Sequence, residues 1–115
     1  MCPQSRLTKI IQEITQKVQA LLGDRLHNII LYGSYARGDF DEESDIDIMV
    51  LADINEDEMR PLEYDLNKIS SRVSLKHDIT VCIMMNNKNL FEQRLPILPF
   101  YQNVINDGVQ IYAGQ

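Results

Sequence analysis

The sequence predicts an α+β fold, with a small sheet and helices packed mainly on one of its faces. Two segments, 5–22 and 57–74, carry apolar residues at helical spacing, which is typical of helices that bury one side. Short apolar runs bounded by polar residues follow both segments and have the length of strands. A chain of 115 residues has room for one core, so we expect residues 1–115 to form a single domain.

The first half of the chain is predicted to begin with its clearest helix. Apolar residues recur every three or four positions from Leu7 to Leu22, and Gly23 is a natural C-terminal stop. The elements expected next are a buried strand at 27–32, a short helical turn at 35–38, a loop at 39–43 and a strand at 45–52.

The second half is predicted to add a helix and a third strand. Pro61 falls in the first turn of the helix, where proline is tolerated. A strand at 78–85 follows and should end at Asn86-Asn87. Residues 90–95 stay ambiguous because prolines close off any long element. The last expected elements are a short helix at 99–107 and an edge strand at 109–113.

Composition narrows the class of protein. The net charge of −6 argues against binding nucleic acid through a basic face. No apolar run reaches the length of a membrane span, and the N-terminus lacks the apolar core of a signal peptide, so we expect a cytoplasmic protein. Cys2 and Cys82 have no metal-ligand spacing and are expected to be free thiols.

The most informative feature is a small-residue turn followed by two carboxylates. Gly33-Ser34 ends one predicted strand, and Asp45 and Asp47 stand at i and i+2 on the next, so both point to the same face. Two adjacent carboxylates repel each other unless a cation lies between them, and oxygen ligands of this kind suit Mg²⁺. Glycine lets the backbone approach a phosphate closely, and the Ser34 hydroxyl can donate to it. A metal-bound nucleoside triphosphate would satisfy both halves.

The stretch resembles the nucleotidyltransferase superfamily that shares the DNA polymerase β catalytic core. It is most similar to minimal nucleotidyltransferases (MNT), whose signature GSxARG is followed by SDIDhhV, where h is apolar. Here the two halves are Gly33-Ser34-Tyr35-Ala36-Arg37-Gly38 and Ser44-Asp45-Ile46-Asp47-Ile48-Met49-Val50. The resemblance implies a minimal core with a small mixed sheet. It also implies that ATP is the substrate and that Asp45 and Asp47 hold two Mg²⁺ ions, one under the triphosphate and one activating the acceptor hydroxyl.

A third carboxylate is needed by the implied reaction, and two aspartates compete for the role. Asp78 precedes an apolar strand, which matches the family pattern, so we predict it as a metal ligand and possible general base. An aspartate that only caps the strand is the alternative. Asp107 sits in Asn-Asp-Gly, a helix-end context that already explains it.

The Arg37 guanidinium has two possible roles. It can orient the phosphates of a nucleotide, or it can pair with a carboxylate of the acidic loop, at Asp39, Asp41 or Glu43. Both readings stay open.

Two histidines and one tyrosine can each have either a structural or a functional role. His77 lies beside Asp78, and His27 opens a strand, but a lone histidine is more often structural. Tyr35 follows Ser34 and can either flank the nucleotide or pack the turn.

The resemblance further implies the biological role. MNT proteins are commonly antitoxins that bind a HEPN-domain toxin ribonuclease and transfer AMP to its tyrosine, so a hetero-oligomer with such a toxin is expected. One alternative is an antitoxin or regulatory subunit that acts by binding alone. Another is an enzyme that modifies a small molecule or a nucleic-acid end, with a helical partner subunit completing the pocket. The acidic composition makes nucleic acid the less favoured acceptor.

Overall fold

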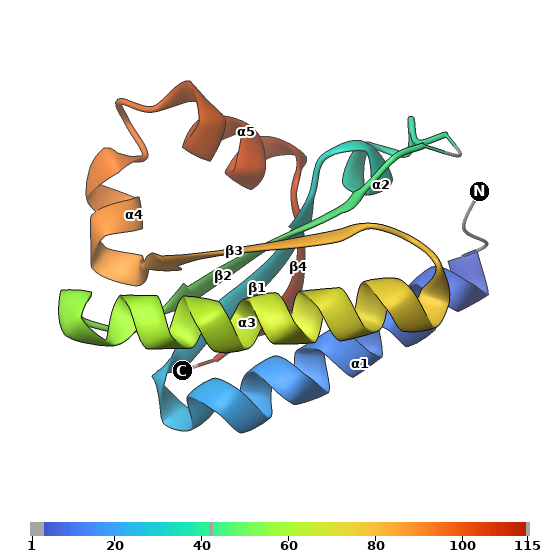
Figure 1. The fold of residues 1–115 in the computed structure, drawn as a ribbon. Coiled ribbons are helices and arrows are strands. Elements are labelled where there is room, and N and C mark those ends of the chain that lie inside the picture. The colour runs from blue at the N-terminus through green and yellow to red at the C-terminus, as the bar shows by residue number, and fades with distance from the viewer. Residues whose placement is uncertain (1–3, 42, 115) are drawn as a thin grey trace.

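A mixed four-stranded sheet forms the centre of the molecule (Figure 1). The computed structural model describes residues 4–41 and 43–114, so the prediction for Cys2 lies outside the described residues. The sheet has the order β3-β2-β1-β4, in which β1 pairs antiparallel with β2 and β4, and β2 pairs parallel with β3. The strands are β1 (Leu26–Tyr32), β2 (Ile46–Ala52), β3 (Val81–Asn87) and β4 (Val109–Ala113).

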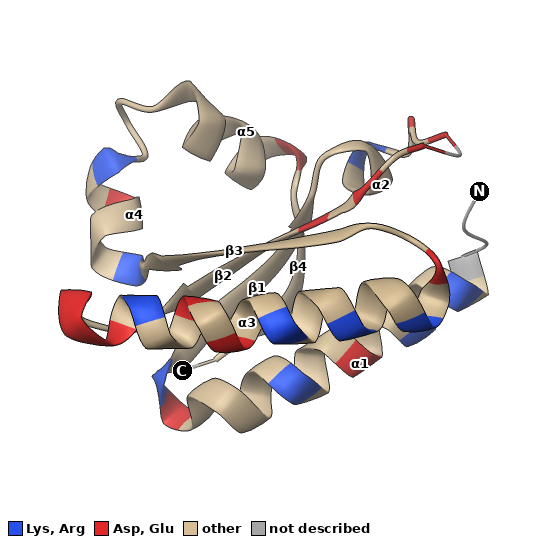
Figure 2. Cartoon of the chain, in the orientation of Figure 1, with Lys and Arg blue, Asp and Glu red and all other residues tan. Residues whose placement is uncertain are grey.

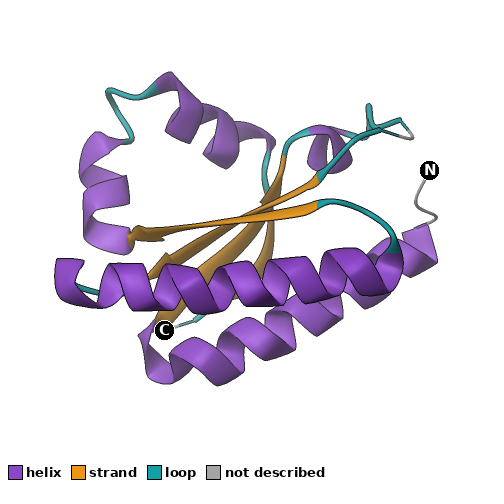
Figure 3. Ribbon diagram, in the orientation of Figure 1, coloured by secondary structure: helices purple, strands orange, loops and turns teal. Residues whose placement is uncertain are grey.

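The two long helices, α1 (Gln4–Leu22) and α3 (Glu56–His77), cover one face of the sheet (Figure 3). Residues of β2 alternate between the two faces, and Ile46, Ile48 and Val50 are fully buried against these helices. The main core therefore lies between this helix pair and the sheet, as the apolar stripes predict.

Two shorter helices, α4 (Lys88–Arg94) and α5 (Pro99–Asp107), lie over the opposite face. Phe91 of α4 and Tyr101 of α5 stack at 4.5 Å between ring centroids and cover Met49 and Leu51 of β2. This second cluster is smaller than the first, which agrees with the predicted α+β fold with helices mainly on one face.

Strand register fixes the neighbours of the predicted carboxylates. Tyr32, the last residue of β1, lies opposite Asp47, and Cys82 of β3 lies beside Asp47 on the other side. Asp47 belongs to the face that carries α4 and α5, because Ile46 and Ile48 on either side of it point to the main core. The end of β1 and the start of β2 thus open toward α5.

The boundary between α3 and β3 differs from the prediction. The helix continues to His77 instead of stopping at residue 74, and Asp78 is its C-cap, with φ 51° and ψ 49°. The strand begins at Val81 and includes Asn86 and Asn87, so the prediction that Asp78 opens a strand was wrong.

Tertiary contacts explain the longer helix. Glu13 of α1 accepts from Lys76 at 3.0 Å and lies 3.2 Å from the His77 ring, which ties the last turn of α3 to α1. The side chains of Ser70 and Ser74 hydrogen-bond the backbone of Val81, so the strand entry is held against the helix. The contacts of Glu13 join residues more than 60 positions apart, whereas those of Ser70 and Ser74 span only the connection between α3 and β3.

The remaining elements agree with the expected order, with small shifts. The ambiguous residues 90–95 belong largely to α4, whose N-cap Asn87 accepts from the Leu90 N–H at 3.1 Å. The helical turn predicted at 35–38 is α2 (Ser34–Arg37), and a 3₁₀ turn, η1 (Gly23–Arg25), joins α1 to β1. Within the described residues, no helix is both long and apolar enough to cross a membrane.

Candidate active site

The turn after β1 requires a glycine for two separate reasons. Gly33 has φ 78° and ψ −155°, a conformation that other residues adopt only with strain. A Cβ atom at this position would lie 2.5 Å from Asp47 Oδ2, closer than real contacts allow. The carboxylate of Asp47 therefore packs directly over the backbone of the turn, which joins the two halves of the sequence motif.

The turn leads at once into the short helix α2. Its first hydrogen bonds run from the N–H groups of Ala36 and Arg37 to the Gly33 carbonyl, both at 3.1 Å. Gly38, with φ 86°, ends the helix in the left-handed conformation typical of a C-terminal glycine. The first turn of α2 thus holds Ser34 and Arg37 beside Asp47.

The two predicted metal ligands have different environments. Asp45 is exposed just before β2, while Asp47 is half-buried within the strand. Burial raises the pKa of Asp47 above its ordinary value and the Asp45 carboxylate raises it further, while the Arg37 guanidinium lowers it. Burial and the Asp45 charge thus both destabilise the ionised form of Asp47, and a bound cation would stabilise it.

A pocket of about 300 Å³ opens over this carboxylate. One wall comes from the end of β1, the turn, α2 and β2, and the other comes from α5. The lining residues are Tyr32, Gly33, Ser34, Arg37, Asp47, Phe100, Asn103, Val104 and Asp107. Four predicted site residues, Gly33, Ser34, Arg37 and Asp47, therefore share one cavity, and Asp45 lies two positions before Asp47.

Arg37 pairs with carboxylates and also lines the pocket. Its Nε donates to Asp39 Oδ2 at 3.1 Å, which is the predicted pairing with the acidic loop. Its Nη1 lies 4.0 Å from Asp107 Oδ2 at the end of α5, and the same side chain lines the pocket. The guanidinium is thus held between two carboxylates at the mouth of the pocket, where an incoming phosphate would compete for it.

Asp78 lies outside this pocket. As the exposed C-cap of α3 it precedes β3 by a short loop, and the position of β3 beside Asp47 belongs to Cys82. Burial, with Asp45 and Asp47, raises the pKa of that thiol, so it stays protonated near neutral pH.

Three other residues take structural roles. His77 pairs with Glu13 on α1 and does not line the pocket. Tyr35 is buried and stacks on Phe40 at 4.4 Å between ring centroids, which packs the turn. His27 lies at the far end of β1, where its carbonyl accepts from the Gly114 N–H at 2.6 Å.

Sequence reasoning missed the wall that α5 contributes. Phe100, Asn103 and Asp107 are brought to the motif by the chain folding back across the sheet, from more than fifty positions away. Tyr32 was missed because it reads as a strand residue. Burial raises its pKa to about 12, with Asp47 and Cys82 adding to the effect. Only the spacing of the α5 residues at i, i+3 and i+7 signals a shared helix face.

The donor set fits a magnesium ion that is shared with a substrate. Among residues 4–41 and 43–114, no group of three or more histidine, cysteine or acidic side chains is arranged to hold a metal by itself. Two carboxylates completed by phosphate oxygens and water are a common magnesium environment. Asp45 and Asp47 could hold the ion in this way, and it would supply charge neutralisation for the triphosphate.

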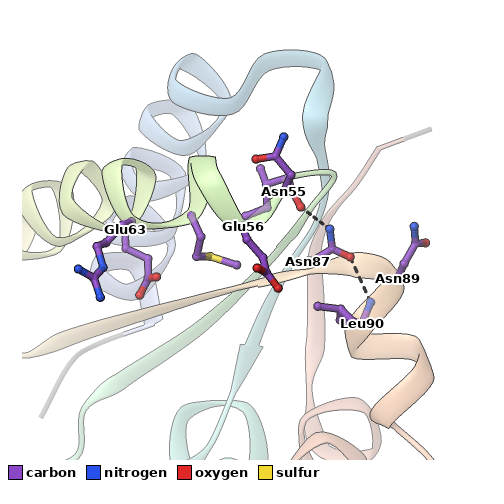
Figure 4. A pocket seen from close by; sticks show the side chains of 9 residues that line it. Asn55, Glu56, Glu63, Asn87, Asn89 and Leu90 are labelled. Carbon is purple, nitrogen blue, oxygen red and sulfur yellow. Dashed lines mark hydrogen bonds between the residues drawn. The ribbon is translucent and has the colours of Figure 1, made fainter.

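The pocket over Asp47 differs from the rest of the molecule in its surrounding charge, and a second cavity lies away from it. Acidic residues gather on the loop between α2 and β2, while α5 has no charged residue before Asp107 (Figure 2). A larger cavity of about 510 Å³ lies at the other end of β2 and β3, between α3 and α4. There Asn87 links the Ile54 carbonyl to the Leu90 N–H (Figure 4). None of the predicted site residues lines that cavity.

Comparison with known proteins gives consistent matches along the chain. The family model described as a nucleotidyltransferase domain matches residues 7–110. A provisionally named protein adenylyltransferase of Methanocaldococcus jannaschii is 36% identical over 105 residues, covering 91% of this chain and 98% of the relative. A second such protein of the same organism is 32% identical over 104 residues, covering 90% and 96%.

Solved structures share the fold at lower identity. A chain of a toxin–antitoxin complex with AMP-PNP matches with a TM-score of 0.61 and 24% identity, over 91% of this chain and 74% of that one. A chain from the complex of a tri-AMPylated Shewanella oneidensis HEPN toxin with its MNT antitoxin matches with a TM-score of 0.55 and 19% identity, over 94% and 72%. A provisionally named nucleotidyltransferase of Sulfolobus solfataricus gives 0.54 and 22%, over 96% and 83%.

These matches confirm the resemblance drawn from the motif. The family model spans nearly all of the described chain, and the region it covers includes the glycine turn and both strand carboxylates. Because the family model covers residues 7–110 and two relatives are 36% and 32% identical over nearly their whole length, the chain belongs to the nucleotidyltransferase family and is a nucleotidyltransferase.

Proposed function

We propose that this protein transfers AMP from Mg²⁺-bound ATP to a hydroxyl group of a partner protein. The observation that carries the proposal is the packing of the Asp47 carboxylate over the Gly33 turn, within a pocket that Ser34 and Arg37 also line. The proposed phosphate contacts and one proposed metal ligand, Asp47, thereby line one cavity, while Asp45 lies two positions before Asp47 and does not line it. The names of the two Methanocaldococcus relatives support adenylyl transfer to a protein.

The proposed reaction forms a bond between the acceptor oxygen and the α-phosphorus while the bond to pyrophosphate breaks, and the acceptor hydroxyl gives its proton to a general base, the role proposed for Asp78. Gly33 N–H and the Ser34 hydroxyl would hold the phosphates, and Arg37 would exchange a carboxylate partner for phosphate. Asp45 and Asp47 would hold two Mg²⁺ ions, which neutralise the charge of the triphosphate. Asp78 remains our proposed third carboxylate, on the acceptor side. Catalysis would rest on positioning and electrostatics.

We further propose that the partner is a HEPN-type toxin and that this chain is its antitoxin, acting in the cytoplasm as a hetero-oligomer. Support comes from structural neighbours that are toxin–antitoxin complexes, including one with an AMPylated HEPN toxin. In this proposal residues 1–115 are one minimal nucleotidyltransferase domain. Neutralisation by binding alone is the second candidate, favoured by the exposure of Asp45, one of the two proposed metal ligands.

Nucleotide binding is expected to require a divalent cation. Calorimetry should detect ATP binding in Mg²⁺ or Mn²⁺ and at least about tenfold weaker binding in excess EDTA, because the carboxylates otherwise repel the triphosphate. The Asp45→Asn, Asp47→Asn double variant should lose the metal dependence, while Asp53→Asn, exposed beyond the other end of β2, should keep it. Equal affinity with and without EDTA in the wild type would exclude the metal site.

Asp47→Asn is expected to stabilise the free protein at neutral pH. The pKa of Asp47 is raised in the folded state, so its ionised form weakens folding above that pKa, and the effect disappears below its ordinary value of 3.8. The variant should melt at a higher temperature than the wild type at pH 7, with a smaller difference at pH 4. Scanning calorimetry of the variant beside Asp53→Asn checks this, and a variant that melts lower at pH 7 would contradict the electrostatic account.

Asp78→Asn should separate transfer from nucleotide binding. Asparagine tolerates the left-handed conformation of this C-cap, so the end of α3 should be preserved. We expect loss of AMP transfer, measured by intact mass of the partner, with ATP affinity within about twofold of the wild type. The matched variant Asp107→Asn should retain transfer. The reverse pattern would move the third carboxylate to Asp107.

Neutralisation of the partner is expected to depend on the two strand carboxylates. The Asp45→Asn, Asp47→Asn double variant should still form the complex but should leave the toxin active and unmodified, because it cannot hold the metal. Growth of cells that express the toxin, together with the partner's mass, measures both outcomes. If the double variant protects as well as the wild type, contact alone suffices and the second candidate is correct.

A further inference from the structure

One helix, α5, supplies the wall of the pocket that faces the phosphate turn. Phe100, Asn103 and Asp107 stand at i, i+3 and i+7, so they share one side of the helix. Val104, fully buried below them, fixes that side toward the sheet. The opposite wall holds the glycine turn, where phosphates are proposed to bind, so the α5 wall is the part of the pocket left for another portion of the nucleotide.

Phe100 offers an aromatic surface in this wall. Phe100 is 42% exposed as a whole residue, although large apolar residues are usually buried. Tyr32 meets it edge to face, with ring centroids 5.7 Å apart and an interplanar angle of 82°. This contact holds the Phe100 ring next to the residue that precedes Gly33, while leaving part of the ring open to a flat partner.

Asn103 adds an amide that has no partner within the described residues. Its neighbour Gln102 is different, because its amide donates to the carbonyls of Leu95 and Pro96, both at 3.1 Å. A carboxamide both donates and accepts, which matches the edge of adenine, where a donor amino group stands beside an acceptor nitrogen.

We propose that Phe100 and Asn103 form the subsite for the adenine base of the donor nucleotide, the ring by stacking and the amide by reading the edge of the base. The proposal rests on the proposed function, since it assumes that the triphosphate lies at Gly33 and Ser34. It assigns base selection to α5 and phosphate binding to the motif. The alternative is that an aromatic side chain of the acceptor protein stacks on Phe100.

Calorimetry with three Mg²⁺-bound ligands tests this: ATP, GTP and inorganic tripolyphosphate, which has no base. Phe100→Ala should weaken ATP binding about tenfold, the usual effect of losing one base–aromatic stack, and should leave tripolyphosphate binding unchanged. Phe100→Tyr, which keeps the ring, should retain ATP affinity. Asn103→Ala should reduce the preference for ATP over GTP about tenfold.

Two substitutions on the same helix serve as matched controls. Ile105→Ala removes an exposed apolar side chain and Asn106→Ala an exposed amide, and neither residue lines the pocket, so both should bind all three ligands like the wild type. Wild-type affinities for Phe100→Ala and Asn103→Ala would overturn the base subsite and leave the phosphate site standing. If the wild type binds neither ATP nor tripolyphosphate with Mg²⁺, the proposed function itself fails.

Discussion

The close approach of the Asp47 carboxylate to the backbone of Gly33 is the contact on which the rest of the site depends. It requires the antiparallel pairing that sets Tyr32 opposite Asp47, and it requires a residue without a Cβ atom at the turn. Because Gly33 also has a positive φ, strain and crowding both select glycine there. The turn and the strand carboxylate are thus positioned as one unit, and α2 then follows in a direction that keeps Arg37 beside it.

The main core and the pocket lie on opposite faces of the sheet. Helices α1 and α3 bury most of one face, and this larger cluster holds the strands in register. The opposite face is covered by two short helices, which leave it open at the start of β2, near Asp47. A half-buried carboxylate is tolerated there because the main core does not depend on it.

The electrostatics of the pocket follow from the same arrangement. Asp47 is partly desolvated beside Asp45, and both causes oppose its ionisation. Arg37 only partly offsets them, since Asp39 and Asp107 also draw on its charge. Under the proposed function, a cation would relieve the repulsion between the two carboxylates, and a phosphate would bring that cation with it.

The sequence by itself determined the glycine turn and the two carboxylates of the proposed nucleotide site. Gly33, Ser34, Asp45 and Asp47 are set by local rules, because glycine permits the turn and strand alternation puts both carboxylates on one face. Only the tertiary structure decided the opposite wall, since Phe100, Asn103 and Asp107 reach the motif through packing of α5 over the sheet. The tertiary structure also decided where α3 ends. Contacts with Glu13 stabilise the helix beyond residue 74, and Asp78 is therefore its C-cap. Interactions between residues distant in the chain have no local pattern from which they could be read.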